Sequence, residues 1–202
     1  MKPWIKFISY EKSKNNLRTI YNRVKDSQDR IDNILMIHSL RPHTLEAHMK
    51  LYKNILHHNN NTLPKWLLET LGVFVSFLNR CDYCVKHHFA GLKRILKDEK
   101  RSDAIWEAIE QDDIDNYFQG RELALMRYAK ALTLDPGHLG EKFVVNLRET
   151  GLNDGEILEA NQLISYFSYA NRTVLGLGVS TDGDILGLSP SDSSDPDNWV
   201  HH

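Results

Sequence analysis

The amino-acid sequence predicts an all-α protein built around one strongly apolar helix. Apolar residues recur at three- and four-residue spacing along most of the chain, as they do on the buried face of a helix. No segment alternates strands with helices, and prolines and glycines separate the periodic runs. With 202 residues, 41% of them hydrophobic, the chain is long enough to bury a core as a single compact unit.

The first quarter of the chain contains three predicted helices. Apolar residues lie at helical spacing over residues 12–24 and again over residues 32–40. Pro42 suits the first turn of a third helix, which extends over residues 43–56. The polar residues 57–61 that follow are typical of a loop.

The most apolar predicted helix covers residues 66–78, with Thr62 as a candidate cap. It is hydrophobic on nearly every side, which is typical of a helix buried in the middle of a fold. Glu69 is the acidic residue that interrupts it. Asn79 and Arg80 make a break, after which residues 81–96 again show a helical pattern. The two cysteines of the chain therefore open a helix.

Four further helices are expected, over residues 102–110, 121–132, 141–149 and 154–175. Residues 1–188 are interpreted as one helical domain with its core at about 32–179. Residues 189–202, rich in Ser, Asp and Pro, are interpreted as a polar C-terminal tail that is mobile or depends on a partner. A weak similarity between residues 63–83 and 152–172 also allows an old internal duplication.

Charge and cysteine content exclude several classes of protein. The formal net charge of −2 provides no broad basic field for nucleic acid or for an anionic membrane. No stretch resembles a signal peptide or a membrane span, so we expect a cytoplasmic protein. Two cysteines three residues apart do not form a framework of structural disulfides, and in a reducing compartment they suggest reversible redox chemistry.

The candidate site consists of Cys81, Cys84 and His88. At about 100° per residue these three lie within an arc of roughly 60° on one helical face, whereas His87 points roughly 100° away from His88 and is expected at the surface. A helix N-terminus and a neighbouring imidazole both favour a thiolate, which points to Cys84 as the activated nucleophile. Cys81, one turn away, can trap a sulfenic acid as a disulfide.

Glu69 is the fourth candidate residue. A carboxylate on an otherwise apolar helix is costly to bury and normally has a partner or a task. It could orient or deprotonate His88, which would complete a carboxylate–imidazole–thiol relay. Pairing with an arginine such as Arg80 or Arg172 is the structural alternative.

These four residues carry a resemblance to a known family. The spacing E-x11-C-x2-C-x3-H within ETLGVFVSFLNRCDYCVKHH resembles the alkyl hydroperoxidase D-like proteins of the carboxymuconolactone decarboxylase superfamily. The flanking segments HSLRPHTLEAHMKLY, LTLDPGHL, LRETGLNDGEILEA and ANRTVLGLGV are similar to its peroxidase-related branch. The resemblance covers the chain from about residue 32 to residue 179.

The resemblance implies a protein with an all-helical fold that assembles into dimers or larger oligomers. It also implies that the protein reduces organic hydroperoxides, with an external dithiol or protein thiol as the reductant. By position, Cys84 matches the cysteine that attacks the peroxide, Cys81 its disulfide partner, and Glu69 and His88 the proton relay. The chain departs from the founding proteins at Tyr83, where they carry a histidine. Equal activity and the same relay are therefore not implied.

Several alternatives remain open. Cys81, Cys84, His88 and Glu69 could instead ligate zinc, although three ligands along one regular helix converge poorly on a tetrahedral ion. The peroxidase interpretation needs no cofactor and no metal.

Two other functions also remain open. A carboxymuconolactone decarboxylase-like lyase would have no need of the dithiol. A redox-responsive binding protein would form the disulfide without turnover. Tyr83, Tyr166 and Tyr169 are interpreted as packing residues outside the site.

Overall fold

The structure is a computed structural model that describes residues 2–201. Within these residues the regular elements are helices, and two isolated β-bridges join loops. The prediction of an all-α fold is therefore confirmed. In chain order the helices are α1 (Asn15–Val24), α2 (Asn33–Met36), α3 (Pro42–Leu56), α4 (Lys65–Leu78), α5 (Asp82–Leu96), α6 (Glu99–Glu110), α7 (Ile114–Tyr117), α8 (Gly120–Leu134), the 3-10 helix η1 (Pro136–His138), α9 (Lys142–Glu149) and α10 (Asp154–Leu177).

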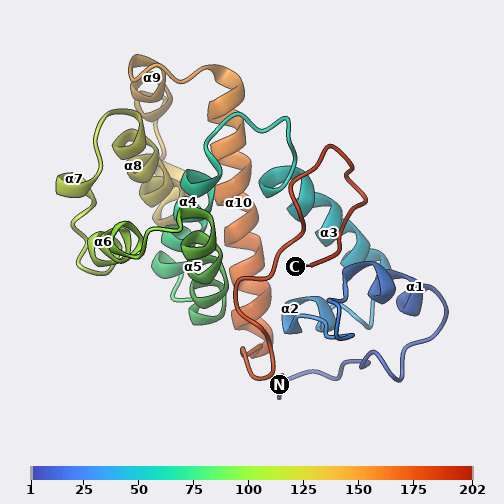
Figure 1. Cartoon of the computed structure of the whole chain (residues 1–202). Helices are drawn as coiled ribbons and strands as arrows, with labels where there is room; N and C mark the ends of the chain where they lie inside the picture. The colour runs from blue at the N-terminus through green and yellow to red at the C-terminus, as the bar shows by residue number, and fades with distance from the viewer. Residues whose placement is uncertain (1, 202) are drawn as a thin grey trace.

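Helix α4 is the centre of the core. It packs against α5, α8 and α10, and its residues 67–76 are all buried. Figure 1 shows the long α10 running through the middle of the molecule, with α4 to α9 on one side and α1 to α3 on the other. A helix that is apolar all round must have neighbours on every side, so the prediction that residues 66–78 form a buried helix is confirmed.

Most differences from the predicted elements lie at helix ends, where side-chain hydrogen bonds set the boundary. Helix α6 begins at Glu99, earlier than expected, because the Asp98 carboxylate accepts a hydrogen bond from the Arg101 backbone N–H. Thr62 does not cap α4; its backbone N–H donates to Glu159 of α10 instead. Helix α2 ends at Met36 and residues 37–40 of the predicted 32–40 helix form turns instead, while a turn at residues 111–112 precedes the short α7.

The possible internal duplication stays a prediction. Helices α4 and α10, which hold the two similar segments, pack directly against each other. Helix α4 ends at Leu78, and Arg80 then takes a left-handed backbone conformation (φ 59°) before α5 begins. Helix α10 has no such break at the corresponding place.

The C-terminal segment, residues 184–201, packs against the helices (Figure 1). Trp199 is only 1% exposed, and the Arg23 guanidinium of α1 lies 3.6 Å above its ring. The fully buried Lys53 amine donates to the backbone carbonyl of Ser191 and to the hydroxyl of Ser193. Gly187 (φ 81°) lies so close to α5 that a Cβ there would be 3.0 Å from the Ala90 carbonyl carbon. The sequence does not indicate these contacts, and the division at residue 189 stays a prediction.

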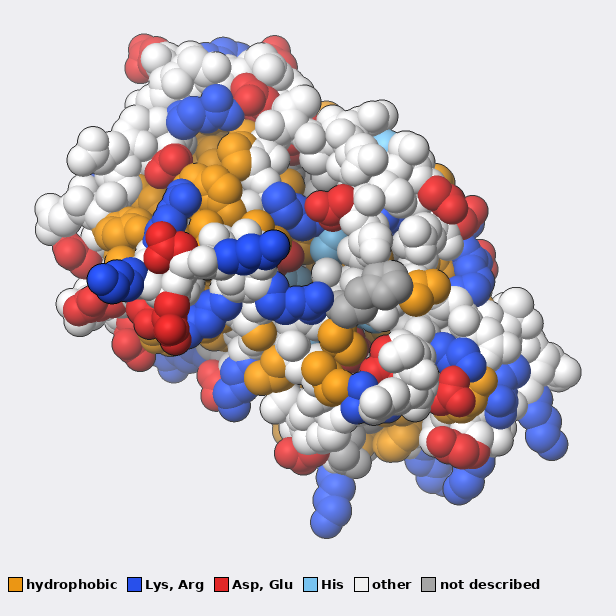
Figure 2. Space-filling model, in the orientation of Figure 1, with side chains coloured by type: hydrophobic (Ala, Val, Ile, Leu, Met, Phe, Trp, Pro, Cys, Tyr) orange, Lys and Arg blue, Asp and Glu red, His pale blue; other side chains and the backbone are white. Residues whose placement is uncertain are grey.

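The surface carries both signs of charge. Figure 2 shows Lys and Arg side chains interspersed with Asp and Glu over the face in view. Across the described part of the chain, none of the helices has the length and the hydrophobicity that crossing a bilayer requires.

Substitution of Gly72 tests the close packing of α4 against α10. A Cβ at this position would overlap the ring of Phe167, whereas a Cβ on Gly176 of α10 would meet nothing. We expect Gly72→Ala to lower the free energy of unfolding by about 1–3 kcal/mol through overpacking. Gly176→Ala should raise it by about 0.5–1 kcal/mol, because alanine stabilises helices. Urea denaturation of both variants measures the two effects, and equal changes would contradict the packing argument.

Candidate active site

The two cysteines begin α5. Cys81 is the N-cap residue and Cys84 lies in the first turn. Both are free thiols, 0% and 3% exposed, and their Sγ atoms are 2.8 Å apart. A disulfide bond of about 2.05 Å would therefore require only a small movement of either side chain. The helical spacing predicted this proximity, because one turn separates the two residues.

Glu69 and His88 meet in the core between α4 and α5. The His88 Nδ1 atom is 2.8 Å from Glu69 Oε2, and Glu69 is only 2% exposed. Burial alone would raise the pKa of Glu69, but the charge and the hydrogen bond of His88 bring it below its ordinary value. The pair predicted as a relay is thus in contact. The alternative partners Arg80 and Arg172 form no ion pair with Glu69 among those that the described residues make.

A cavity of about 50 Å³ adjoins these groups. Cys84, Glu69 and His88 all line it, whereas Cys81 is not among its lining residues within the described chain. The ring of Phe167 meets His88 edge to face, with 4.5 Å between the ring centroids. Cys84 is therefore the thiol that a molecule in the cavity would meet, and Cys81 lies behind it.

The pKa directions of the two thiols differ from the sequence-based expectation. The hydrogen bond with Cys84 lowers the pKa of Cys81 against the effect of burial, and a hydrogen bond with Asn171 adds to this. Burial, followed by Cys81, raises the pKa of Cys84 well above its usual value. Because the two thiols are hydrogen-bonded to each other, the proton that remains after the first ionisation belongs to the pair, and the helix terminus alone does not make Cys84 the thiolate.

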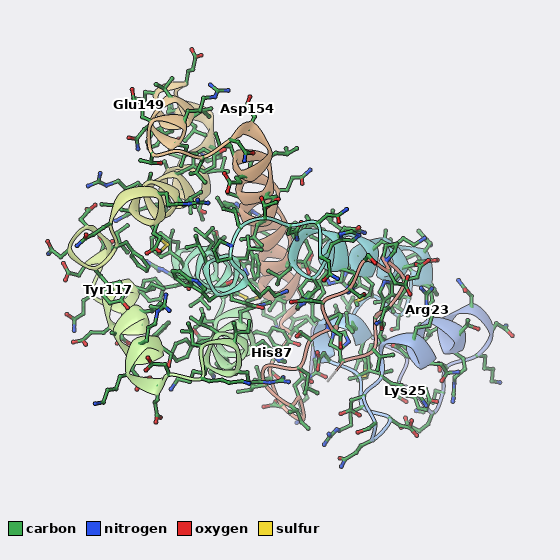
Figure 3. The ribbon with its side chains drawn as sticks, turned by 45° about the horizontal axis from the view of Figure 1, so that its top comes forward. Arg23, Lys25, His87, Tyr117, Glu149 and Asp154 are labelled. Atoms are coloured by element: carbon green, nitrogen blue, oxygen red, sulfur yellow. The ribbon has the colours of Figure 1, made fainter. Side chains whose placement is uncertain are left out.

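His87 is buried rather than exposed, so the expectation of a surface residue is wrong. Its ring stacks on Tyr83 with 4.5 Å between centroids, and its Nε2 lies 3.3 Å from Asp184 Oδ2. Figure 3 shows His87 on the side of α5 that faces the C-terminal segment. Helical phase predicted its direction relative to His88, but not that the segment after α10 covers that face.

Tyr83 and Tyr166, interpreted from sequence as packing residues, both line the cavity. The Tyr83 hydroxyl donates to Asp184 Oδ2 at 2.7 Å and accepts from the Ile34 backbone N–H at 3.1 Å. Tyr83, one residue before Cys84, is thus held by a carboxylate from the C-terminal segment. Tyr169 does not line the cavity; its hydroxyl lies 3.5 Å from His38 Nε2.

Asp32 and His48 are cavity residues that the sequence did not indicate. Asp32 precedes α2 and His48 lies on α3, far from the cysteines in sequence. Burial raises the pKa of Asp32 to about 7, with Asp184 and Asp26 adding to the rise and His87 opposing it. Burial lowers the pKa of His48 to about 3. No local motif marks either residue, because both reach the cavity only through tertiary packing.

The zinc alternative finds no matching geometry. Among residues 2–201, no three or more His, Cys, Asp or Glu side chains are arranged to hold a metal ion. Cys81, Cys84 and His88 lie along one face of α5, an arrangement that converges poorly on a tetrahedral centre.

Known proteins share the fold of this chain. The carboxymuconolactone decarboxylase family model matches residues 42–131. No curated protein matches the chain. A peroxidase-related protein with an alkylhydroperoxidase AhpD core from Ralstonia eutropha JMP134 has a TM-score of 0.74 at 19% identity, over 88% of this chain and 91% of that one.

Two further solved structures are similar. A peroxidase-related protein from Silicibacter sp. TM1040 has a TM-score of 0.66 at 21% identity, over 74% of this chain and 76% of that one. The debrominase Bmp8 has a TM-score of 0.66 at 18% identity, over 81% of this chain and 84% of that one. At these identities the similarity establishes a shared fold.

Asp32 makes a testable contribution to pH dependence. Its folded-state pKa of about 7 lies above the ordinary 3.8, so between these pH values the folded chain keeps a proton that the unfolded chain has lost. The free energy of unfolding should therefore fall as pH rises from about 4 to 7. Asp32→Asn removes this effect, and its stability relative to wild type should rise by about 3 kcal/mol over this range. Urea denaturation at pH 4 and pH 8 measures the difference, and a constant difference would contradict the assignment.

Proposed function

We propose that the chain is an alkyl hydroperoxidase D-like protein of the carboxymuconolactone decarboxylase superfamily and that it reduces organic hydroperoxides through a Cys81/Cys84 dithiol–disulfide cycle. One observation carries the proposal. Cys84 lines the same small cavity as the Glu69–His88 pair, and Cys81 lies 2.8 Å behind it. This arrangement supports the proposal, because a nucleophile, its proton relay and a resolving thiol must lie this close together.

The reaction begins with the loss of one proton from the dithiol. His88 accepts it, and Glu69 stabilises the imidazolium through the 2.8 Å contact to Nδ1. The second proton stays between the two sulfur atoms, so the thiolate on Cys81 can take the Cys84 proton as Cys84 attacks. This transfer lets the cavity-facing sulfur react although its own pKa is raised.

The Cys84 sulfur attacks the terminal oxygen of the hydroperoxide. The O–O bond breaks, an S–O bond forms, and His88 returns its proton to the departing alkoxide, which leaves as an alcohol. The Cys81 thiol then attacks the Cys84 sulfenic acid, and a disulfide forms with release of water. The sum is two thiols and one hydroperoxide converted to a disulfide, an alcohol and water.

A reductant outside the chain must restore the dithiol. We propose a small dithiol or a protein thiol, which attacks the disulfide and leaves as a disulfide itself. Because both cysteines are almost fully buried, the start of α5 must move locally before the reductant can reach the disulfide. We also propose a homo-oligomer, because oligomers are common in this family.

Two other functions would leave different signatures. A decarboxylase-like lyase needs no sulfur chemistry, so activity on a muconolactone should survive the loss of both cysteines. A redox-responsive binding protein would form the disulfide once and change its assembly without turnover. The contact between the two sulfurs favours thiol chemistry over the lyase, and the Glu69–His88 pair beside Cys84 favours the peroxidase over the binding protein.

The cysteine variants test the cycle directly. We expect ethyl hydroperoxide to convert the reduced wild-type protein to the Cys81–Cys84 disulfide. Cys84→Ser should abolish the reaction, because the cavity-facing nucleophile is lost. Cys81→Ser should consume about one equivalent of hydroperoxide and stop at the sulfenic acid. Stopped-flow kinetics with mass spectrometry measure these outcomes, and a Cys84→Ser protein that still turns over would refute the proposal.

Glu69→Gln tests the relay. The amide can still accept a hydrogen bond from His88 but has no charge to stabilise an imidazolium, so we expect the rate of disulfide formation to fall about 100-fold, with an altered pH profile. Asp135→Asn is the matched control, since Asp135 contacts His138 at 2.9 Å in an exposed pair. A purely structural role for Glu69 would lower stability and leave the pH profile of the remaining activity unchanged.

A further inference from the structure

The cavity has a second polar wall that the dithiol cycle does not use. Asp32, His48 and His87 all line it. They come from three separate parts of the chain: the residue before α2, helix α3 and helix α5. His201 of the C-terminal segment completes this side, with its Nε2 atom 3.9 Å from Asp32 Oδ2.

His48 has a buried ring nitrogen without a partner. The residue is 4% exposed, and its Nε2 atom is 3.3 Å from the Tyr166 hydroxyl. Its Nδ1 atom has no hydrogen-bond partner among the described residues. Buried polar atoms are normally paired, so an unpaired one on a cavity-lining residue marks a hydrogen-bonding position that the described chain leaves unfilled. The low pKa of His48 keeps the ring uncharged at neutral pH.

His87 gives a second such nitrogen. Its Nε2 lies 3.3 Å from Asp184 Oδ2, near enough for an ion pair when protonated, but the two atoms are not aligned for a hydrogen bond. One cavity is thus lined by two histidines that each have a buried ring nitrogen without a hydrogen bond. Asp32 beside them can donate a hydrogen bond in its protonated form.

The size of the cavity limits what can bind. A cavity of about 150 Å³ accommodates benzene. The space beside Cys84 is about 50 Å³, which is enough for a few non-hydrogen atoms. Leu188 and Ser189 of the C-terminal segment lie in its wall, so a bulky molecule could enter only if this segment moved.

The charge of the cavity excludes anions. The Glu69 carboxylate in its wall is ionised, because its pKa lies below the ordinary value, and Asp32 becomes a second negative charge whenever it loses its proton. Within the described chain no lysine or arginine lines it, so nothing there would neutralise a carboxylate on a ligand. The hydrogen-bonding groups and the charge therefore both favour an uncharged polar molecule.

We propose that Asp32, His48 and His87 form a binding site for a small uncharged hydroperoxide, such as ethyl hydroperoxide, whose oxygen atoms they hydrogen-bond beside Cys84. This inference rests on the proposed peroxidase function and narrows its substrate class. Bulky hydroperoxides such as that of cumene, and fatty-acid hydroperoxides with their carboxylate, are poor substrates for this cavity.

Binding can be measured without turnover. A Cys81→Ser/Cys84→Ser protein with ¹⁵N-labelled histidine is titrated with ethyl hydroperoxide and, separately, with cumene hydroperoxide. We expect a saturable NMR shift of the His48 ring nitrogens with the first compound alone. No shift at His48, or equal shifts with both compounds, would overturn the site.

Kinetics on the dithiol protein give a second test that does not need the serine variants. The second-order rate constant for disulfide formation should be at least 10-fold higher with ethyl hydroperoxide than with cumene or linoleic acid hydroperoxide. His48→Phe should lower the ethyl hydroperoxide value about 10-fold, His48→Gln should retain most of it, and His138→Phe at an exposed position should leave it unchanged. Equal rates for all three hydroperoxides in the wild type would overturn the size and charge selectivity.

The two arms separate the two proposals. If no hydroperoxide forms the disulfide in the wild type while His48 still responds to ethyl hydroperoxide, the peroxidase function fails and the binding site stands. If the disulfide forms rapidly while His48 does not respond, the function stands and the site fails.

Discussion

The site depends on the buried contact between Glu69 and His88. A carboxylate in the middle of an apolar helix loses its hydration on folding, and only a close hydrogen-bonding partner compensates for that loss. His88 supplies this partner from α5 at 2.8 Å. The contact ties α5 to α4 at one register, and the first turn of α5 then holds Cys84 at the same cavity as the imidazole.

The packing of α10 against α4 completes this arrangement. Gly72 leaves room for the ring of Phe167, and that ring in turn supports His88 edge to face. Tyr166, the preceding residue of α10, contacts His48 on α3. One helix therefore links the relay on one side of the cavity to the second polar wall on the other.

The C-terminal segment determines the size and the polarity of the cavity. Asp184 holds Tyr83 and lies beside His87, while Leu188 and Ser189 form part of the wall. Burial of the Trp199 side chain and the bonds from the Lys53 amine fix this segment against the helices. A short polar stretch thus gives the site its small volume, although its own composition is typical of a mobile tail.

The sequence alone determined the features that depend on local spacing. Helical periodicity predicts the all-α fold and the buried α4, and about two turns of helix bring Cys81, Cys84 and His88 to one face. Tertiary structure decided that Glu69 meets His88 rather than an arginine, and it alone decided that His87 is covered and that Asp32 and His48 reach the cavity. The raised pKa of Cys84 also depends on burial, which is set by residues distant in sequence. Periodicity describes which face of a helix is apolar, but not which segment covers it.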